Sequence, residues 1–354
     1  MTSESYCTRN GSALTSKLPI CCTLTELCHV VVRGETLSHV VSNAGPMECT
    51  NNDAGARVLS IQSHVVSGYA GNKCAVFPMQ IHGFEVDTID TVQFSNHTGY
   101  RHWKGQILRL EHLKELYEGL RLADLLDYTH CLTGYVADEL VLAEVANIVS
   151  HLLERNPNLV YVCDPVMGDC GNYYVSKAML PIYRDRLLPL ADVTTPNQFE
   201  LEELTGIKVN CEADIVGAMT TLLLRTIKKV VVTSTELDLN STQLCGYFGE
   251  RKDDGRVVIH KFEVDRFKEH FVGTGDLFAS LLLVWLHKTD GCLLTAVSKA
   301  QASVQDVLKH TLYHTKRICP VGTLPSPKAL ELRIVQSVDH LSAPKSSVKI
   351  IPLE

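Results

Sequence analysis

The sequence predicts an α/β fold with a mainly parallel central sheet and helices on both faces, a three-layer α/β/α arrangement. From Arg57 onward, short β-branched or apolar runs alternate with helix-like stretches. This alternation is typical of strands joined by crossover helices. Hydrophobic residues make up 45% and charged residues 21% of the 354 residues, which is ordinary globular composition. The chain is long enough for one large domain or for two or three smaller ones.

Residues 1–56 differ from the rest of the chain. They are rich in Ser, Thr, Asn and Cys and show no sustained helical or strand period. We therefore expect a poorly ordered N-terminal extension over 1–56, followed by a folded domain over 57–354. Within the extension, 27–32 could form one short strand or helical turn.

The elements of the folded domain are predicted in chain order. Asp138 is a plausible N-cap for a helix that reaches Glu154 and carries an apolar stripe. A second helix-like stretch starts at 195–196 and stops before Gly206, and a long helix runs from Asp276. The strands are expected at 57–62, at 85–94 with a break, at 159–163, at 229–233, and in a hairpin formed by 244–248 and 256–262.

Composition and missing motifs exclude several classes of function. The net charge is −7 and no basic block is present, which disfavours nucleic-acid binding. The thirteen cysteines are scattered and form no Cys-x-x-Cys pair, which favours a reducing, cytoplasmic location. The most apolar run, 277–286, is shorter than the roughly 20 residues that span a bilayer, so no membrane association is expected. No Gly-Lys dipeptide occurs, so there is no Walker-type phosphate loop.

The strongest functional motif is Phe271-Val-Gly-Thr-Gly-Asp-Leu-Phe278, which opens the last long helix. Its glycines let backbone N–H groups approach an anion, and a helix N-terminus adds partial positive charge. Asp276 would then lie beside that anion, where a carboxylate can accept a proton from an attacking hydroxyl. The alternative is a glycine-rich turn in which Asp276 only caps the helix.

Two further motifs carry acidic residues. Asn197 and Glu200, in Thr194-Thr-Pro-Asn-Gln-Phe-Glu200, share one helix face and would suit a hydrated Mg²⁺, although for this motif by itself a simple capped helix start is the better explanation. Asp164 and Asp169 follow a strand and would suit a cation or a polyphosphate, although Asp, Pro and Gly are also ordinary turn formers.

Small hydroxyls and histidines follow two other strands. Ser60-Ile-Gln-Ser-His-Val65 and Phe94-Ser-Asn-His-Thr-Gly-Tyr100 could line a pocket for a small polar ring, and Leu132-Thr-Gly-Tyr135 is a weaker signal of the same kind. The alternative for His64 and His97 is that each is a partly buried histidine with a structural role.

Taken together and in this order, the five motifs resemble the pyridoxal kinases of the ribokinase-like superfamily, and the resemblance extends to 329–336 near the C-terminus. It implies ATP-dependent phosphorylation of the 5′-hydroxymethyl group of pyridoxal, pyridoxine or pyridoxamine. It makes Asp276 the base and Gly273, Thr274 and Gly275 the anion hole. The segment after Asp169 is shorter than the glycine-rich loop of that family.

The resemblance also assigns the remaining site residues and partners. It implies Mg²⁺ (or Zn²⁺) with ATP, K⁺ (or Na⁺) as activator, and a homodimer. The implied vitamer contacts are Ser63, His97, Thr98 and Tyr135. The implied nucleotide contacts are Asp164, Asn197, Gln198, Phe199, Glu200, Thr233, Ser234, Thr274 and Tyr174. The implied cation ligands are Asp164, Asp169, Thr195, Thr233 and Glu200.

Two alternatives stay open from the sequence. A related kinase could act on another hydroxymethyl heterocycle, such as the pyrimidine precursor of thiamine. A catalytically silent homologue could bind vitamin or nucleotide without turnover.

Overall fold

The computed structural model describes residues 55–353 except 226, 236, 239 and 321. All described residues belong to one compact unit, residues 51–354. The predictions for residues 1–54, including the short element at 27–32, therefore lie outside the described residues.

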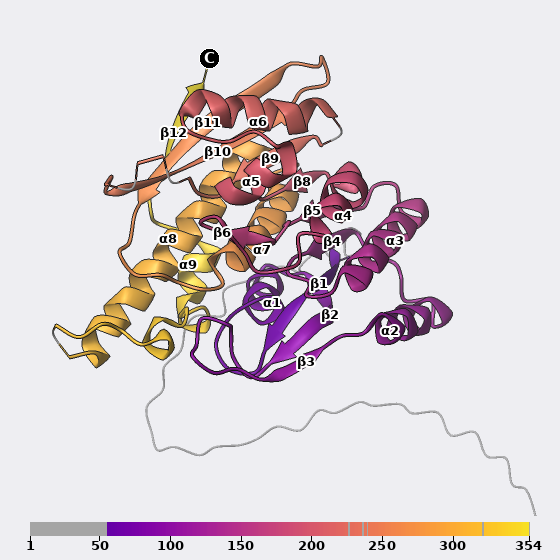
Figure 1. Cartoon of the computed structure of the whole chain (residues 1–354), viewed down its shortest axis with the longest axis horizontal. Helices are drawn as coiled ribbons and strands as arrows, with labels where there is room; N and C mark the ends of the chain where they lie inside the picture. The colour runs from indigo at the N-terminus through magenta and orange to yellow at the C-terminus, as the bar shows by residue number, and fades with distance from the viewer. Residues whose placement is uncertain (1–54, 226, 236, 239, 321, 354) are drawn as a thin grey trace, which may run out of the picture. The chain divides into compact units, whose positions relative to one another are not determined.

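A ten-stranded sheet forms the centre of this unit (Figure 1). Its order is β12-β11-β10-β9-β8-β5-β4-β1-β2-β3, and the six strands from β9 to β2 run parallel. The strands at both ends, β3 and β10 to β12, are antiparallel to their neighbours. The strands are β1 Arg57–Val65, β2 Glu85–Phe94, β3 Gly105–Ile107, β4 His130–Thr133, β5 Val160–Cys163, β8 Val193–Thr194, β9 Lys229–Val232, β10 Gln243–Arg251, β11 Val257–Asp265 and β12 Lys349–Leu353.

Helices cover both faces of the sheet (Figure 1). None of those in the described part of the chain is both long and apolar enough to cross a membrane. A two-stranded hairpin, β6 Gly168–Asp169 with β7 Asn172–Tyr173, lies outside the main sheet. The helices are α1 Asn72–Ile81, α2 Leu110–Leu122, α3 Glu139–Arg155, α4 Met179–Ile182, α5 Gln198–Thr205, α6 Glu212–Arg225, α7 Thr274–Lys288, α8 Leu293–Ile318 and α9 Val338–Ser342.

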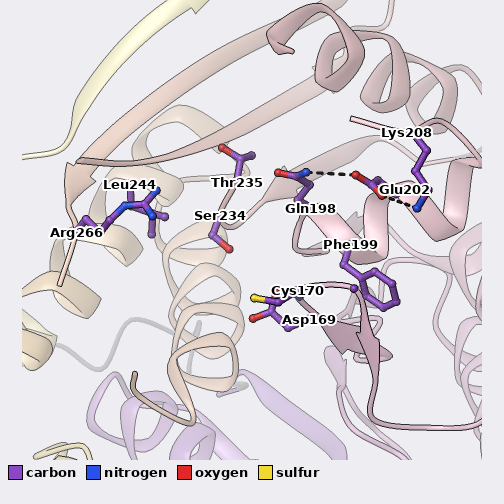
Figure 2. Close-up of a pocket in the computed structure, with 11 residues that line it drawn as sticks. Asp169, Cys170, Gln198, Phe199, Glu202, Lys208, Ser234, Thr235, Leu244 and Arg266 are labelled. Atoms are coloured by element: carbon purple, nitrogen blue, oxygen red, sulfur yellow. Dashed lines mark hydrogen bonds and ion pairs between the residues drawn. The ribbon is translucent and has the colours of Figure 1, made fainter. Parts of the chain in front are cut away.

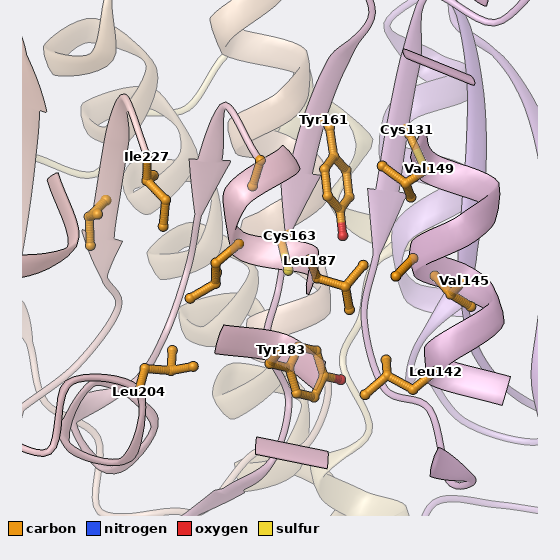
Figure 3. Close-up of a cluster of buried hydrophobic side chains, with 14 of the residues drawn as sticks. Cys131, Leu142, Val145, Val149, Tyr161, Cys163, Tyr183, Leu187, Leu204 and Ile227 are labelled. Atoms are coloured by element: carbon orange, nitrogen blue, oxygen red, sulfur yellow. The ribbon is translucent and has the colours of Figure 1, made fainter. Parts of the chain in front are cut away.

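Alternation along the strands divides the core between the two faces, because successive side chains of a strand point to opposite sides. Cys131 and Tyr161 pack with α3 and α6 in one cluster, part of which Figure 3 shows. Their neighbours Leu132 and Val162 pack with α1, α7 and α8 in the other. The predicted three-layer α/β/α fold is confirmed.

Several predicted elements are confirmed, with small shifts at their ends. Asp138 caps α3, since its carboxylate accepts from the amides of Leu140 and Val141. Helix α5 begins at Gln198 rather than at 195–196, because Asn197 has extended backbone and serves as the N-cap. Helix α7 begins at Thr274, two residues before the predicted start, because the left-handed Gly273 is its N-cap. Strand β2 runs unbroken.

The sheet order predicts a ligand site beside β1. From β1 the chain steps to β2 on one side, and the later parallel strands β4, β5, β8 and β9 are added on the other. Open α/β sheets bind ligands beyond the carboxyl ends of the strands at such a switch point. The segments that follow β1, β4 and β5 should therefore build the site.

Candidate active site

The N-terminus of α7 is open to a ligand. Gly273 adopts φ 88°, and no side chain within the described residues caps the helix. A Cβ at Gly273 would collide with the carbonyl oxygen of Tyr69, so a larger residue cannot take this place. The first amides of a helix lack intrahelical partners. Here they remain available to an anion.

Asp276 lies in the first turn of α7, against the segment that follows β1. Its Oδ2 accepts a hydrogen bond of 2.7 Å from the amide of Gly71. Gly71 has φ 55°, and a Cβ there would collide with the backbone and hydroxyl of Ser63. Burial raises the pKa of Asp276, and the Gly71 amide offsets this only in part. The structure thus brings Ser63 and Asp276 against the same glycine.

Asp164, which follows β5, lies close to the same helix start. A Cβ on Gly275 would be 3.9 Å from Asp164 Oδ2. The other oxygen, Oδ1, accepts from the Thr195 hydroxyl at 3.0 Å. The side chain is buried, and burial, followed by the charges of Glu200 and Asp276, raises its pKa well above the usual value.

Glu200 and Asn197 form the capping box that the sequence left open as an alternative. Glu200 Oε2 accepts from the Asn197 amide at 3.0 Å, and Oε1 accepts from the Met167 amide at 2.9 Å. Asn197 in turn donates to the carbonyl of Gly168 at 2.7 Å. Burial raises the pKa of Glu200 to about 7 despite these backbone hydrogen bonds. The pair therefore ties α5 to the turn after β5.

These buried carboxylates fit a bound cation. Within the described residues no Lys or Arg forms an ion pair with Asp164, Glu200 or Asp276. Uncompensated buried charge is costly, so a cation would relieve it. The described part of the chain contains no cluster of three or more His, Cys, Asp or Glu side chains that could hold a metal ion by itself. Mg²⁺ does not need one, because it keeps several waters and uses few carboxylates.

The two other predicted cation ligands lie beside this cluster. Asp169 ends β6, and its Oδ1 accepts from the Cys170 amide at 2.8 Å. Its charge contributes to the raised pKa of Glu200. The amide of Thr233, at the end of β9, donates to the carbonyl of Pro196 at 3.0 Å. Thr233 is thus joined to the segment just before α5, whereas Asp169 acts on Glu200 through its charge.

The four residues predicted to contact a ring surround the end of β1 but differ in exposure. Ser63 and Tyr135 are partly buried, and Tyr135 packs on a small apolar cluster that includes Phe94. Thr98 is exposed, and its neighbour Gly99 lies against Val272 of the anion-hole segment.

His97 is bound to another residue. It is 7% exposed, and its Nε2 lies 3.2 Å from Glu331 Oε1. The partly buried structural role that the sequence left open therefore describes this side chain well.

A cavity of about 400 Å³ lies next to the first turn of α5 (Figure 2). In Figure 2 Arg266 and Leu244 lie at one end, Gln198 and Lys208 at the other, and Ser234 between them. Its size is that of a small-ligand site. The lining residues are Asp169, Cys170, Gly171, Gln198, Phe199, Glu202, Lys208, Ser234, Thr235, Leu244 and Arg266.

The short segment after Asp169 forms the β6–β7 hairpin at the edge of this cavity. Its turn is Cys170-Gly171, both with positive φ. Tyr173 anchors the hairpin by packing edge-on against Phe199 and by donating from its hydroxyl to Glu203. Tyr174, predicted to contact nucleotide, lies outside the lining set and is 56% exposed.

Sequence reasoning missed several residues of this site. Gly71 was included in the motif that follows the first strand, but its contact with Asp276, which spans 205 positions, was not predicted. Arg266 and Lys208 line the cavity, yet no motif surrounds either of them. Glu331 lies in the segment 329–336, which resembles the pyridoxal kinases but to which no role was assigned.

Comparison with known proteins shows the family to which the chain belongs. The model of a family described as phosphomethylpyrimidine kinase matches residues 132–322. Over 316 residues the chain is 45% identical to a pyridoxal kinase from Sus scrofa, covering 86% of this chain and 98% of that protein. The chain belongs to the pyridoxal kinase family. Membership makes it a phosphotransferase of the ribokinase-like fold.

Other members of the family show the same extent of similarity. A pyridoxal kinase from Arabidopsis thaliana is 44% identical over 302 residues, covering 84% of this chain and 94% of that protein. The solved structure of pyridoxal kinase from Leishmania donovani in complex with ADP and pyridoxamine superposes with a TM-score of 0.77 at 36% identity. That match covers 84% of this chain and 99% of the solved chain.

Proposed function

We propose that this protein transfers the γ-phosphoryl group of ATP to the 5′-hydroxymethyl group of pyridoxal, pyridoxine or pyridoxamine. One observation carries the proposal: Asp276 stands in the first turn of α7, beside an uncapped helix start and against the segment after β1. This arrangement supports a base and an anion site that lie next to the residues proposed to contact the vitamer ring. The relative solved with ADP and pyridoxamine supports a nucleotide and a vitamer as the two ligands.

Asp276 would act as the general base. It takes the proton of the vitamer hydroxyl while that oxygen forms a bond to the γ-phosphorus. The bond from the γ-phosphorus to the oxygen bridging it to the β-phosphate breaks, and ADP leaves with that electron pair. The amides of Gly273, Thr274 and Gly275 hold the charge on the transferred group. Burial favours this role, because a raised pKa makes the carboxylate a stronger base.

The acidic cluster would hold the cations. Asp164, Asp169, Thr195, Thr233 and Glu200 are the proposed residues for Mg²⁺ (or Zn²⁺) and for K⁺ (or Na⁺). Such ions neutralise phosphate charge during phosphoryl transfer. Thr195 orients Asp164, and Glu200 fixes the turn that carries Asp169.

Nucleotide and vitamer would occupy neighbouring parts of the crevice. For ATP we propose the cavity of Figure 2, where Gln198, Phe199 and Ser234 lie, together with Asp164, Asn197, Glu200, Thr233, Thr274 and Tyr174. For the vitamer we propose the side chains around the end of β1: Ser63, His97, Thr98 and Tyr135.

An assay of ADP release across the three vitamers, with and without K⁺, tests this proposal. We expect turnover with at least one vitamer and stimulation by K⁺. The hydroxymethylpyrimidine precursor of thiamine is included because the matching family model carries that description. A higher kcat/KM for the pyrimidine would overturn the substrate assignment.

The same assay decides whether the protein is a catalytically silent homologue. That alternative rests on the short segment after Asp169. The intact start of α7 and the position of Asp276 favour a working enzyme. Binding of ATP without ADP release above background would support the silent homologue.

We further propose a cytoplasmic homodimer. Its catalytic domain is 57–354 together with Ala56, whose side chain packs on the cluster of α1 and α7, and residues 1–54 are dispensable for folding. Light scattering coupled to gel filtration measures the oligomeric state. A monomer at micromolar concentration would contradict the dimer.

A further inference from the structure

Glu331 reaches the site from the C-terminal part of the chain and contacts both segments that follow β1 and β2. Its Oε2 accepts from the Tyr69 amide at 2.9 Å. Its Oε1 accepts from the Tyr100 hydroxyl at 2.8 Å and lies 3.2 Å from His97 Nε2. The Glu331 side chain is 16% exposed. Three donors from two distant segments thus converge on one carboxylate.

The His97 contact has a defined direction. The Gly99 amide donates to His97 Nδ1 at 3.1 Å, so Nδ1 carries a lone pair rather than a proton. The proton of the neutral ring is therefore on Nε2, which donates to Glu331. Burial alone would raise the pKa of Glu331, but the bonds from His97, Tyr100 and Tyr69 outweigh it and lower the pKa. Glu331 is an ionised acceptor.

The segment after β1 is held between Glu331 and the anion hole. On one side Gly68 packs so closely on the Glu331 carboxylate that a Cβ would collide with it. On the other side the Tyr69 carbonyl packs against Gly273, and the Gly71 amide binds Asp276. Any shift of Tyr69 would therefore move the donor that orients Asp276.

The segment after β2 is fixed by the same carboxylate. His97 and Tyr100 flank Thr98, and a Cβ on its neighbour Gly99 would be 3.4 Å from Val272 of the anion-hole segment. Thr98 itself is exposed and follows whatever position its neighbours take.

Hydrogen bonds to α8 hold the backbone on either side of Glu331. The Thr315 hydroxyl of α8 donates to the carbonyl of Ala329 at 2.6 Å, and the Arg333 amide donates to the Thr311 hydroxyl at 3.0 Å. Both anchors lie two residues from Glu331, one before it and one after it.

We propose that Glu331 is a positioning residue that sets the vitamer segment 95–100 and, through Tyr69 and Gly71, the catalytic carboxylate of Asp276. The inference rests on the proposed function and deepens it. Glu331 touches no reacting atom. It acts by holding two loops in the geometry that the reaction needs, where small displacements cost large factors in rate.

The test compares Glu331→Gln with Asp339→Asn. An amide has one oxygen acceptor and cannot serve three donors. Asp339→Asn removes the same charge from an exposed residue of the same C-terminal region.

For Glu331→Gln we expect kcat/KM for the vitamer to fall roughly 10- to 100-fold, with a lower kcat. KM for ATP should stay within about twofold, because no residue lining the nucleotide cavity binds Glu331. Asp339→Asn should match wild type.

Amide hydrogen exchange provides a readout that needs no turnover. Glu331→Gln should speed exchange in peptides covering 66–74 and 95–104 and leave those from α3 unchanged. Equal exchange in both segments would overturn the positioning role, even if the wild type proves inactive on every vitamer. Absence of wild-type turnover with altered exchange would instead count against the proposed function alone.

Tyr100→Phe serves if Glu331→Gln does not fold. It removes one of the three donors and keeps the carboxylate. We expect kcat/KM for the vitamer to fall about three- to fivefold, again with KM for ATP unchanged. A parallel rise in KM for ATP, or no kinetic change, would contradict the inference.

Discussion

The amide of Gly71 donates a 2.7 Å hydrogen bond to Oδ2 of Asp276 and so joins the loop after β1 to the first turn of α7. The bond leaves Oδ1 of Asp276 available to a substrate hydroxyl. It also explains why Gly71 has positive φ, since the chain must turn sharply to aim this amide. The loop after β1 and the glycine motif at the start of α7 thus form one connected part of the site.

Asp276→Asn should remove most of the activity. An amide oxygen can still accept from Gly71, so the fold and the helix start are preserved, but the base is lost. A general base contributes about 10²- to 10⁴-fold to the rate. We expect kcat to fall within that range while the Kd for ATP, measured by calorimetry, changes less than about twofold. A loss of only a few-fold would remove Asp276 from the role of base. Asp290→Asn, at an exposed turn after α7, is the matched control.

Gly273→Ala and Gly275→Ala should separate stability from catalysis. At Gly273 the positive φ and the Tyr69 carbonyl both oppose a side chain, so we expect a loss of about 1–3 kcal/mol in the free energy of unfolding. At Gly275 a Cβ meets only Asp164 Oδ2 at 3.9 Å, so stability should change little. The added methyl would nevertheless enter the space proposed for the phosphoryl group and lower kcat. Thermal unfolding and steady-state kinetics measure both. Equal stability of the two variants would contradict this account.

Arg266→Ala should weaken ATP binding without slowing the chemical step. Arg266 lines the cavity, its Nε donates to the Gln243 carbonyl at 3.4 Å, and no described carboxylate forms an ion pair with it. A guanidinium here is free to bind a nucleotide. Loss of one charge-assisted hydrogen bond, about 1.5 kcal/mol, corresponds to roughly a tenfold rise in KM for ATP.

Arg256→Ala is the control for this prediction. It removes the same charge from an exposed turn between β10 and β11, where Arg256 pairs with Asp254. If both variants raise KM for ATP equally, the effect is long-range charge rather than contact in the cavity.

The layers of the fold and the motifs formed by neighbouring residues could be predicted from the sequence, because both depend on local patterns. Alternating strands and helices predicted the sheet, and Asp138 marked the start of α3. Strand β3 was missed, since three exposed residues at an edge leave no hydrophobic pattern. Glu331 was missed for a different reason. Its donors lie 231 and 262 positions away, and such pairing depends on how the loops pack rather than on spacing.

The boundary of the catalytic domain illustrates the same limit. Ala56 was assigned to the extension, yet its carbonyl accepts from the Glu85 amide at 3.0 Å and its side chain packs on the cluster of α1 and α7. Removal of residues 1–54 should therefore leave the melting temperature and kcat unchanged. Removal of 1–56 should lower the melting temperature slightly, as measured by differential scanning fluorimetry. Aggregation of the 1–54 deletion would show that the extension is needed for folding or assembly.

Cation binding should be linked to proton release. Burial raises the pKa of Glu200 to about 7 and that of Asp164 well above its usual value, so the cation-free cluster holds protons near neutrality. A cation favours the ionised carboxylates and displaces those protons. Mg²⁺ affinity should therefore rise with pH, because protons compete for the site when the pH falls below the raised pKa values.

Calorimetry of the Mg²⁺–ADP complex at pH 6.5 and pH 8, each in two buffers of different ionisation enthalpy, measures this linkage. We expect tighter binding at pH 8 and proton release at pH 6.5. Glu200→Gln should reduce the number of protons released, whereas Glu154→Gln, on the exposed end of α3, should not. Affinity independent of pH would mean that the cation binds away from Asp164 and Glu200. The acidic cluster would then serve only to join α5 to the turn after β5.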